Sequence, residues 1–164
     1  MILVLMGVSG TGKTTVGKIL ASRLGWTFVE GDDFHSAANK AKMHAGIPLT
    51  DADRWPWLEA LRHRIDEARA RRENLVLACS ALKHSYQHYL RDDLNNVHYV
   101  YLEASESVIR ERLAHRAGHF MNPDLLHSQF ETLEPPEHAL RVDVKPPPDV
   151  VADEILARLP VGWK

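Results

Sequence analysis

Eight consecutive residues near the start of the chain match the phosphate-loop pattern G-x-x-x-x-G-K-[ST] without a mismatch. They follow an apolar run at residues 2–6, which predicts a buried strand, and lead into a segment whose apolar residues have helical spacing. In such a turn, backbone N–H groups can surround a phosphate, Lys13 can reach the β- and γ-phosphates, and the Thr14 hydroxyl can ligate Mg²⁺. We therefore predict a nucleotide site formed by Gly7, Val8, Ser9, Gly10, Thr11, Gly12, Lys13, Thr14 and Thr15.

The elements that must hold this loop alternate between strands and helices. Short apolar runs predict strands at residues 2–6, 26–30, 75–79, 97–102 and 140–144. Helical spacing predicts a helix from residue 13, three more at 55–72, 105–116 and 125–133, and a last helix capped by Asp149. For the helix at 55–72 we expect Asp51 or Asp53 as the cap. This order predicts an α/β fold, a three-layer α/β/α sandwich with a five-stranded parallel sheet that binds ligands at the carboxyl ends of its strands.

Length and composition favour a single domain over residues 1–164. The formal net charge of −2 provides no general basic field for nucleic acid or an anionic membrane. The only cysteine, Cys79, cannot form an internal disulfide, which suits a reducing cytosol. The first apolar run is too short for a transmembrane helix and lacks the features of a signal peptide. We expect a cytoplasmic protein without a nucleic-acid or membrane partner.

Two large classes of phosphate-loop protein are not favoured. Switch GTPases and motor ATPases usually place a Mg²⁺-binding aspartate after an apolar strand, but the strand at 75–79 ends in Cys79 and Ser80. The guanine-reading pattern N-K-x-D is also missing, because Asn39-Lys40-Ala41-Lys42 lacks the aspartate. Small phosphotransferases remain, in which a second substrate binds opposite ATP and a mobile lid brings in arginines.

Further blocks of the chain resemble the gluconate kinases, or gluconokinases, a family of small phosphate-loop kinases related to shikimate kinase. The resemblance runs nearly end to end, and its middle blocks are more specific than the phosphate loop. The blocks lie at residues 30–35, 39–58, 79–91, 118–121 and 125–134. Departures are small: Asn122 stands where proline is common, and His84 and Gln87 stand where basic residues are frequent.

The resemblance implies an activity and its partners. Gluconate kinases phosphorylate D-gluconate at its 6-hydroxyl with MgATP, usually as a cytosolic homodimer. The products are ADP and 6-phospho-D-gluconate, which feeds carbohydrate acid catabolism and the pentose phosphate pathway. By the same resemblance we expect a lid at residues 112–130 and place Gln129 among the substrate-binding residues.

Carboxylates after the second predicted strand could perform the chemistry. Asp32 stands where a carboxylate can accept the proton of the acceptor hydroxyl, and it resembles the catalytic aspartate of sugar-acid and shikimate kinases. Asp33 competes with it for this role. Glu30 could hold a Mg²⁺-bound water. His35 could form a hydrogen bond with a gluconate hydroxyl, or be an ordinary loop histidine.

A sugar acid also needs a cationic partner for its carboxylate. Arg54 is our candidate, because a guanidinium can bind a carboxylate through two parallel hydrogen bonds and lysine cannot. The alternative is that Arg54 anchors its own loop by pairing with Asp51 or Asp53. Lys83 is a second candidate for facing the substrate.

Arg112 and Arg116 lie one helical turn apart, just before residues 117–121. The pair suits a lid, with Arg112 over adenine and Arg116 offsetting charge on the transferring phosphoryl group. A solvated helix face is the alternative. His84 and His88 have the i, i+4 spacing of a zinc helix, but no further ligand accompanies them, so metal binding there is not favoured.

Two other functions remain open at this stage. The chain could be a kinase for a nucleoside monophosphate or another sugar acid, or a nucleotide-binding module without turnover. Intact Lys13, Thr14 and Asp32 argue against the second alternative.

Overall fold

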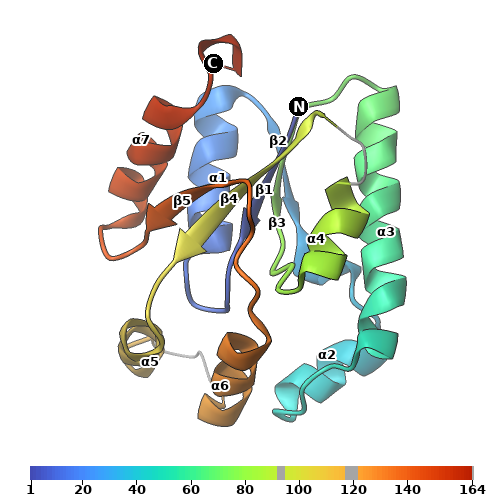
Figure 1. Cartoon of the computed structure of the whole chain (residues 1–164), viewed down its shortest axis with the longest axis vertical. Helices are drawn as coiled ribbons and strands as arrows, with labels where there is room; N and C mark the ends of the chain where they lie inside the picture. The colour runs from blue at the N-terminus through green and yellow to red at the C-terminus, as the bar shows by residue number, and fades with distance from the viewer. Residues whose placement is uncertain (92–94, 117–121, 164) are drawn as a thin grey trace.

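The structure is a computed structural model that describes residues 1–91, 95–116 and 122–163 (Figure 1). Its strands are β1 (Ile2–Met6), β2 (Thr27–Glu30), β3 (Leu75–Ala78), β4 (Val97–Glu103) and β5 (Ala139–Asp143). Its α-helices are α1 (Lys13–Leu24), α2 (Ala37–His44), α3 (Asp51–Ala70), α4 (His84–Arg91), α5 (Glu106–Ala114), α6 (Pro123–Thr132) and α7 (Pro148–Arg158). Two 3₁₀-helices, η1 (Gly31–Phe34) and η2 (Val161–Trp163), complete the described elements.

The five strands form one parallel sheet in the order β2-β3-β1-β4-β5. At its centre, Ile2 of β1 is in register with Leu75 of β3 on one side and Val97 of β4 on the other. A parallel strand buried on both faces needs a continuous apolar sequence, which explains the runs of β1 and β3. Because all strands point the same way, the phosphate loop after β1 and the acidic turn after β2 leave the sheet at the same end, where the strands have their carboxyl ends.

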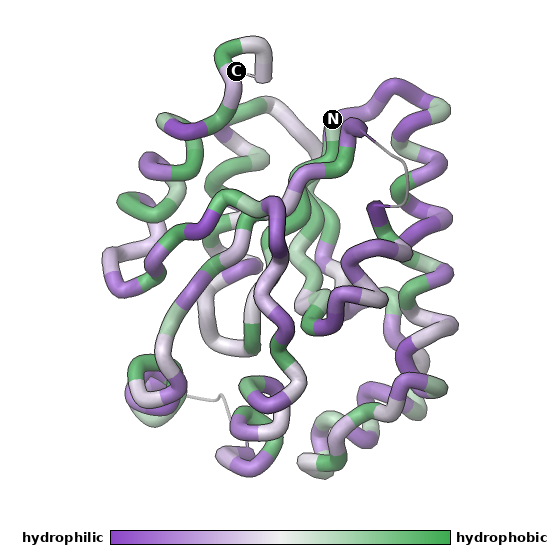
Figure 2. The backbone as a smooth tube through the Cα atoms, in the orientation of Figure 1, coloured by the Kyte–Doolittle hydropathy of each residue, from purple (hydrophilic) through white to green (hydrophobic). Residues whose placement is uncertain are grey.

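Alternate side chains of the sheet enter two separate hydrophobic cores. Val4 and Met6 pack with residues of α3 and α4, whereas Leu3 and Leu5 pack with residues of α1 and α7. The two helix pairs accordingly lie on opposite sides of the sheet in Figure 1, and Figure 2 shows the apolar strands between them. This three-layer α/β/α arrangement confirms the predicted fold class.

The remaining α-helices lie beyond the carboxyl ends of the strands. Figure 1 shows α2, α5 and α6 in this position, away from both chain termini. They therefore surround the edge of the sheet where the phosphate loop begins. Within the described ranges, no helix is both long and apolar enough to cross a bilayer.

Two predicted helix caps differ from the structure. Thr50, and neither Asp51 nor Asp53, is the N-cap of α3: its Oγ1 accepts from the Asp53 backbone N–H at 3.1 Å. The Asp53 carboxylate accepts from the Thr50 N–H at 2.9 Å, which completes a capping box. The last helix begins at Pro148, so Asp149 lies in its first turn and does not cap it.

Gly31 begins η1 where β2 passes close to β3. A Cβ atom at this position would lie 2.4 Å from the Ala78 carbonyl oxygen, a backbone atom held within the sheet. We expect Gly31→Ala to lower the free energy of unfolding by about 1–3 kcal/mol, as overpacking does, and the melting temperature by roughly 2–12 °C. Gly162→Ala is the matched control, because a Cβ there meets nothing within 4 Å. Equal melting temperatures for the two variants would contradict this account.

Candidate active site

A cavity of about 470 Å³ lies at the carboxyl edge of the sheet. Its described lining residues come from the phosphate loop, the segment after β2, α2 and Leu49 beyond it, α3, the segment after β3, α5 with Arg116 beyond it, and α6. Among the site residues predicted from the sequence, those that line it are Ser9, Gly10, Lys13, Asp32, His35, Arg54, Arg116 and Gln129. The fold therefore brings the predicted phosphate-binding and acceptor-binding groups around one space.

Two glycines of the phosphate loop, Gly7 and Gly12, have positive φ angles that favour glycine. Gly7 has a φ of 147°, and a Cβ there would lie 2.7 Å from the Leu102 carbonyl oxygen. Gly12, with a φ of 90°, is the N-cap residue of α1. The chain thus turns directly from β1 into the N-terminus of α1, where the free N–H groups and the helix dipole favour an anion.

Lys13 points back into this loop. Its Nζ donates to the carbonyl oxygens of Gly7 and Val8, at 2.9 Å each. Burial lowers the pKa of Lys13, while the nearby negative charges of Asp32 and Glu30 act in the opposite direction. The ammonium group is held inside the loop, close to where a bound phosphate would lie.

Glu30 connects the phosphate loop to the acidic turn. Its Oε2 accepts a short hydrogen bond from the Thr14 hydroxyl, and its Oε1 lies 3.4 Å from the backbone nitrogen of Asp32. The Thr14 and Glu30 oxygens therefore lie side by side, and both are of the hard type that Mg²⁺ prefers. The described residues contain no cluster of three His, Cys, Asp or Glu side chains that could hold a metal. Mg²⁺ in a phosphate site does not need one, because waters and substrate phosphates supply most of its ligands.

The structure separates the two candidate bases. Both Asp32 and Asp33 lie in η1, but of the two only Asp32 is among the described residues that line the cavity. The backbone N–H of His35 donates to the Asp32 carbonyl oxygen at 3.2 Å and ends this turn. Geometry therefore favours Asp32 over Asp33.

His35 is buried against Trp57 at the wall of the cavity. The two rings stack with centroids 4.3 Å apart and planes 13° apart. Trp57 Nε1 donates to the Gly31 carbonyl oxygen at 2.8 Å, so the same indole holds both the start of η1 and the imidazole. Trp57 therefore belongs to the hydrophobic core and also lines the cavity.

Arg54 lines the cavity from the first turn of α3. The described residues contain no ion pair between Arg54 and Asp51 or Asp53, because Asp53 pairs with Lys42 at 2.9 Å and Asp51 with Lys83 at 2.8 Å. Arg54 Nη1 instead lies 3.3 Å from the Tyr86 hydroxyl. The guanidinium therefore keeps capacity for a ligand.

Lys83 is connected to the same tyrosine through a carboxylate. Asp51 Oδ1 accepts from Lys83 Nζ and also accepts a short hydrogen bond from the Tyr86 hydroxyl. The hydrogen bond with Asp51 raises the pKa of Lys83, and the hydrogen bonds from Lys83 and Tyr86 lower the pKa of Asp51. Lys83 itself is not one of the described residues that line the cavity.

The two predicted lid arginines differ in position. Arg116 lines the cavity. Arg112 instead donates to the carbonyl oxygens of Val144, in a short contact, and Lys145, at 3.3 Å. The central part of the predicted lid, residues 117–121, lies outside the described residues.

Gln129 of α6 contacts the phosphate loop directly. Its Oε1 accepts from the Ser9 backbone N–H at 2.8 Å, and its Nε2 donates to the Ser9 hydroxyl at 3.1 Å. The sequence offered no signal for this pair of hydrogen bonds. Gln129 therefore links α6 to the phosphate loop, in addition to lining the cavity.

Comparisons with known proteins identify the family of this chain. A family model described as an AAA domain matches residues 2–136. The gluconokinase of Gluconobacter oxydans is 49% identical over 157 residues, covering 94% of this chain and 88% of the relative. The thermosensitive gluconokinase of Escherichia coli is 43% identical over 145 residues, covering 86% of this chain and 78% of the relative. The chain belongs to the gluconokinase family. This membership confirms the resemblance predicted from the motifs and implies the use of a nucleotide.

Solved structures extend the gluconokinase comparison to the fold. The crystal structure of a gluconokinase from Sinorhizobium meliloti has a TM-score of 0.86 and 48% identity, and the match covers 94% of this chain and 89% of that one. Shikimate kinase from Aquifex aeolicus has a TM-score of 0.59 at 16% identity, over 96% and 94% of the two chains. The second comparison shows a shared fold alone.

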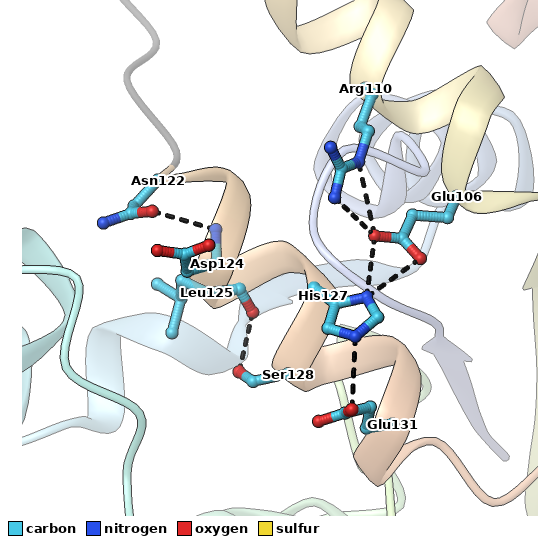
Figure 3. A network of polar contacts seen from close by, with 8 residues as sticks. All are labelled: Glu106, Arg110, Asn122, Asp124, Leu125, His127, Ser128 and Glu131. Atoms are coloured by element: carbon cyan, nitrogen blue, oxygen red, sulfur yellow. Dashed lines mark hydrogen bonds and ion pairs between the residues drawn. The ribbon is translucent and has the colours of Figure 1, made fainter.

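In this member of the gluconokinase family, an ion-pair network joins α5 to α6 (Figure 3). His127 lies between two carboxylates, with Nδ1 3.1 Å from Glu106 Oε1 and Nε2 3.1 Å from Glu131 Oε1. Glu106 also accepts from Arg110 at 2.9 Å. The hydrogen bond and charge of Glu106, followed by the charge of Glu131, raise the pKa of His127. The network connects the two helices on either side of residues 117–121.

The raised pKa gives this network a definite pH dependence. The stabilisation from His127 is fully present below the ordinary histidine pKa of about 6.5 and is lost as the pH rises through the higher folded-state value. We expect His127→Gln to lower the melting temperature more at about pH 5.5 than at about pH 9. In a Glu106→Gln background this difference between the two pH values should shrink. A larger loss at alkaline pH would refute the assignment.

Proposed function

We propose that the protein transfers the γ-phosphoryl group of MgATP to the 6-hydroxyl of D-gluconate. The observation that carries the proposal is the single cavity that joins Lys13 of the phosphate loop to the Asp32 carboxylate and the Arg54 guanidinium. These are the groups that a phosphoryl donor, a hydroxyl acceptor and a substrate carboxylate require. The names of the relatives support gluconate as the acceptor.

At the donor end, the loop from Gly7 to Thr15 binds the phosphates through its backbone N–H groups. Lys13 exchanges its two carbonyl partners for β- and γ-phosphate oxygens. The Thr14 hydroxyl ligates Mg²⁺ and Glu30 holds one of its waters, a role that their mutual hydrogen bond supports. When bound, Mg²⁺ would offset the negative charge of the phosphates. Arg112, next to the segment after β5, packs on adenine.

At the acceptor end, donors and acceptors face the cavity from different elements. Arg54 binds the gluconate carboxylate through two parallel hydrogen bonds, and Lys83, which pairs with Asp51 and is not among the described lining residues, adds a second cation nearby. His35 and Gln129 bind hydroxyl groups of gluconate. An acceptor without a carboxylate loses the pairing with Arg54 and leaves that charge partly unpaired.

Catalysis then depends on two groups beside the transferred phosphoryl. Asp32 orients the 6-hydroxyl and accepts its proton, which leaves an oxygen aligned for in-line attack. Arg116 offsets the charge that builds on the phosphoryl oxygens in the transition state. Because a loose transition state needs little covalent help, most of the rate enhancement comes from this positioning.

The wider organisation is also a proposal. We infer one kinase domain over residues 1–164 that acts in the cytoplasm as a homodimer, with residues 112–130 closing over ATP as a lid. The position of α5 and α6 beyond the carboxyl edge of the sheet supports the lid (Figure 1). The family resemblance supports the dimer and the compartment.

A coupled ADP-release assay with MgATP over a panel of acceptors tests the function. We expect rapid turnover with D-gluconate and poor turnover with glucose, which has the primary hydroxyl but no carboxylate. If a nucleoside monophosphate is turned over faster than gluconate, the nucleoside monophosphate and not gluconate is the acceptor. ADP release with none of the acceptors would favour a nucleotide-binding module.

Asp32→Asn separates catalysis from binding. If the carboxylate orients and deprotonates the acceptor hydroxyl, this variant should lower kcat by roughly 10²–10⁴-fold while the affinity for MgATP changes little. Asp33→Asn is the matched control, and we expect near-normal kcat because Asp33 does not line the cavity. A normal Asp32→Asn enzyme together with an inactive Asp33→Asn enzyme would transfer the role to Asp33.

Arg54→Lys tests the carboxylate site. The variant keeps the charge but loses the paired hydrogen bonds, so kcat/KM for gluconate should fall roughly 10- to 100-fold, the effect of one charge-assisted hydrogen bond. The KM for MgATP should change little. If gluconate kinetics are unchanged, the carboxylate binds elsewhere, and Lys83→Met becomes the next variant to measure.

A further inference from the structure

The orientation of one buried amide determines which nitrogen of His35 carries a proton. Asn39, on α2, is 7% exposed, and its Nδ2 lies 2.8 Å from the Asp53 carbonyl oxygen. A carbonyl oxygen only accepts, so the atom facing it is the amide NH₂ and not the amide oxygen. The backbone N–H of Asn39 donates to the Ser36 hydroxyl at 3.1 Å, which anchors the residue in the first turn of α2.

The second hydrogen of the same NH₂ group faces the imidazole. Asn39 Nδ2 lies 3.3 Å from His35 Nδ1. Two N–H groups cannot share a hydrogen bond, so Nδ1 is the acceptor and carries no proton. A neutral imidazole then has its proton on Nε2. Burial lowers the pKa of His35, and the positive charges of Arg54 and Lys40 act in the same direction, whereas the charge of Asp32 opposes them. The lowered pKa favours the neutral ring.

The other side of the ring is available to a ligand. His35 lines the cavity together with Asp32 and Arg54. Its ring plane is held by the stack on Trp57, so the Nε2–H direction is fixed along with the tautomer. Among the residues that the structure describes, Nε2 makes no hydrogen bond, whereas Nδ1 is occupied by Asn39.

We propose that Asn39 is a positioning residue that holds His35 as the neutral Nε2–H tautomer, so that the ring donates a hydrogen bond to an oxygen of the acceptor substrate. This inference rests on the proposed function and deepens it. His35 and Arg54 then present donors to the cavity, while Asp32 presents an acceptor. Such a wall favours a ligand with oxygen acceptors along most of its length and one hydroxyl that gives up a proton, as a sugar acid has.

The tautomer of His35 can be determined without an assay of enzyme activity. Two-bond ¹H–¹⁵N correlation spectra of the labelled protein distinguish a protonated Nε2 from a protonated Nδ1, and the His35→Gln spectrum identifies the His35 signals by their loss. We expect an unprotonated Nδ1 and a protonated Nε2 in the wild-type protein at neutral pH. A protonated Nδ1 would overturn the proposal, even if the substituted proteins failed to fold.

Asn39→Asp tests the use of this proton. A carboxylate accepts where the amide donated, so the proton should move to Nδ1 and the KM for gluconate should rise about tenfold, with the KM for MgATP nearly unchanged. In a His35→Gln background, whose amide can donate in place of Nε2, Asn39→Asp should not raise the gluconate KM further. An equal rise in both backgrounds would show that Asn39 acts only through local structure and would overturn the proposal.

Ser36→Ala is the matched control in the same segment. It removes the N-cap of α2 and lowers stability, but leaves the Asn39 amide facing His35, so the tautomer and the gluconate KM should be retained. A shift of the tautomer in this variant would contradict the role of the amide. If the wild-type enzyme does not phosphorylate gluconate at all, the proposed function fails, and the spectrum still decides the tautomer.

Discussion

The parallel pairing of β1 with both β3 and β4 is the constraint on which the site depends. The residues of β1 are fully buried, and the strand is hydrogen-bonded on both sides, so the position where the phosphate loop begins is set by the centre of the sheet. Parallel direction then brings the segments after β2 and β3 to the same edge. Had β3 paired with β1 in the antiparallel direction, with β2 still parallel to β3, both segments would lie at the opposite end of the sheet.

Single polar contacts between elements refine this arrangement. Glu30 connects Thr14 to the acidic turn, Trp57 connects α3 to the same turn, and Gln129 connects α6 to Ser9. Each contact joins two of the segments that surround the cavity. Phosphoryl transfer demands mainly positioning and charge stabilisation from a protein, and these contacts supply positioning.

The sequence predicted those parts of the structure that depend on local patterns. The five strands follow from short apolar runs, and the phosphate loop follows from glycine and lysine spacing next to one of them. Helices α2 and α4 were not predicted, because eight residues give too few turns for a clear apolar period. The sequence predicts an aspartate as the cap of α3, but Thr50 is the N-cap and Asp53 is the third helical residue of the same capping box. Only the backbone geometry shows which of the two residues precedes the helix.

Contacts between distant segments had no signal in the sequence. Gln129 and Ser9 are 120 residues apart, and no spacing rule joins them. Arg54 was identified by the chemistry of a guanidinium, but its freedom from Asp51 and Asp53 depends on Lys83 and Lys42 taking those partners. His35 and Asn39 have the i, i+4 spacing of helix neighbours, yet the role of the amide depends on Asp53 from another helix.

The central claim is that one cavity holds the phosphate donor and the sugar-acid acceptor in line. A crystal structure of the ternary complex with Mg²⁺, a non-hydrolysable ATP analogue and D-gluconate tests it most directly. The account predicts the γ-phosphate at Lys13, the gluconate 6-hydroxyl within hydrogen-bonding distance of Asp32, and the carboxylate at Arg54. Gluconate bound with its carboxylate toward the γ-phosphate, or outside the cavity lined by Asp32 and Arg54, would contradict the account.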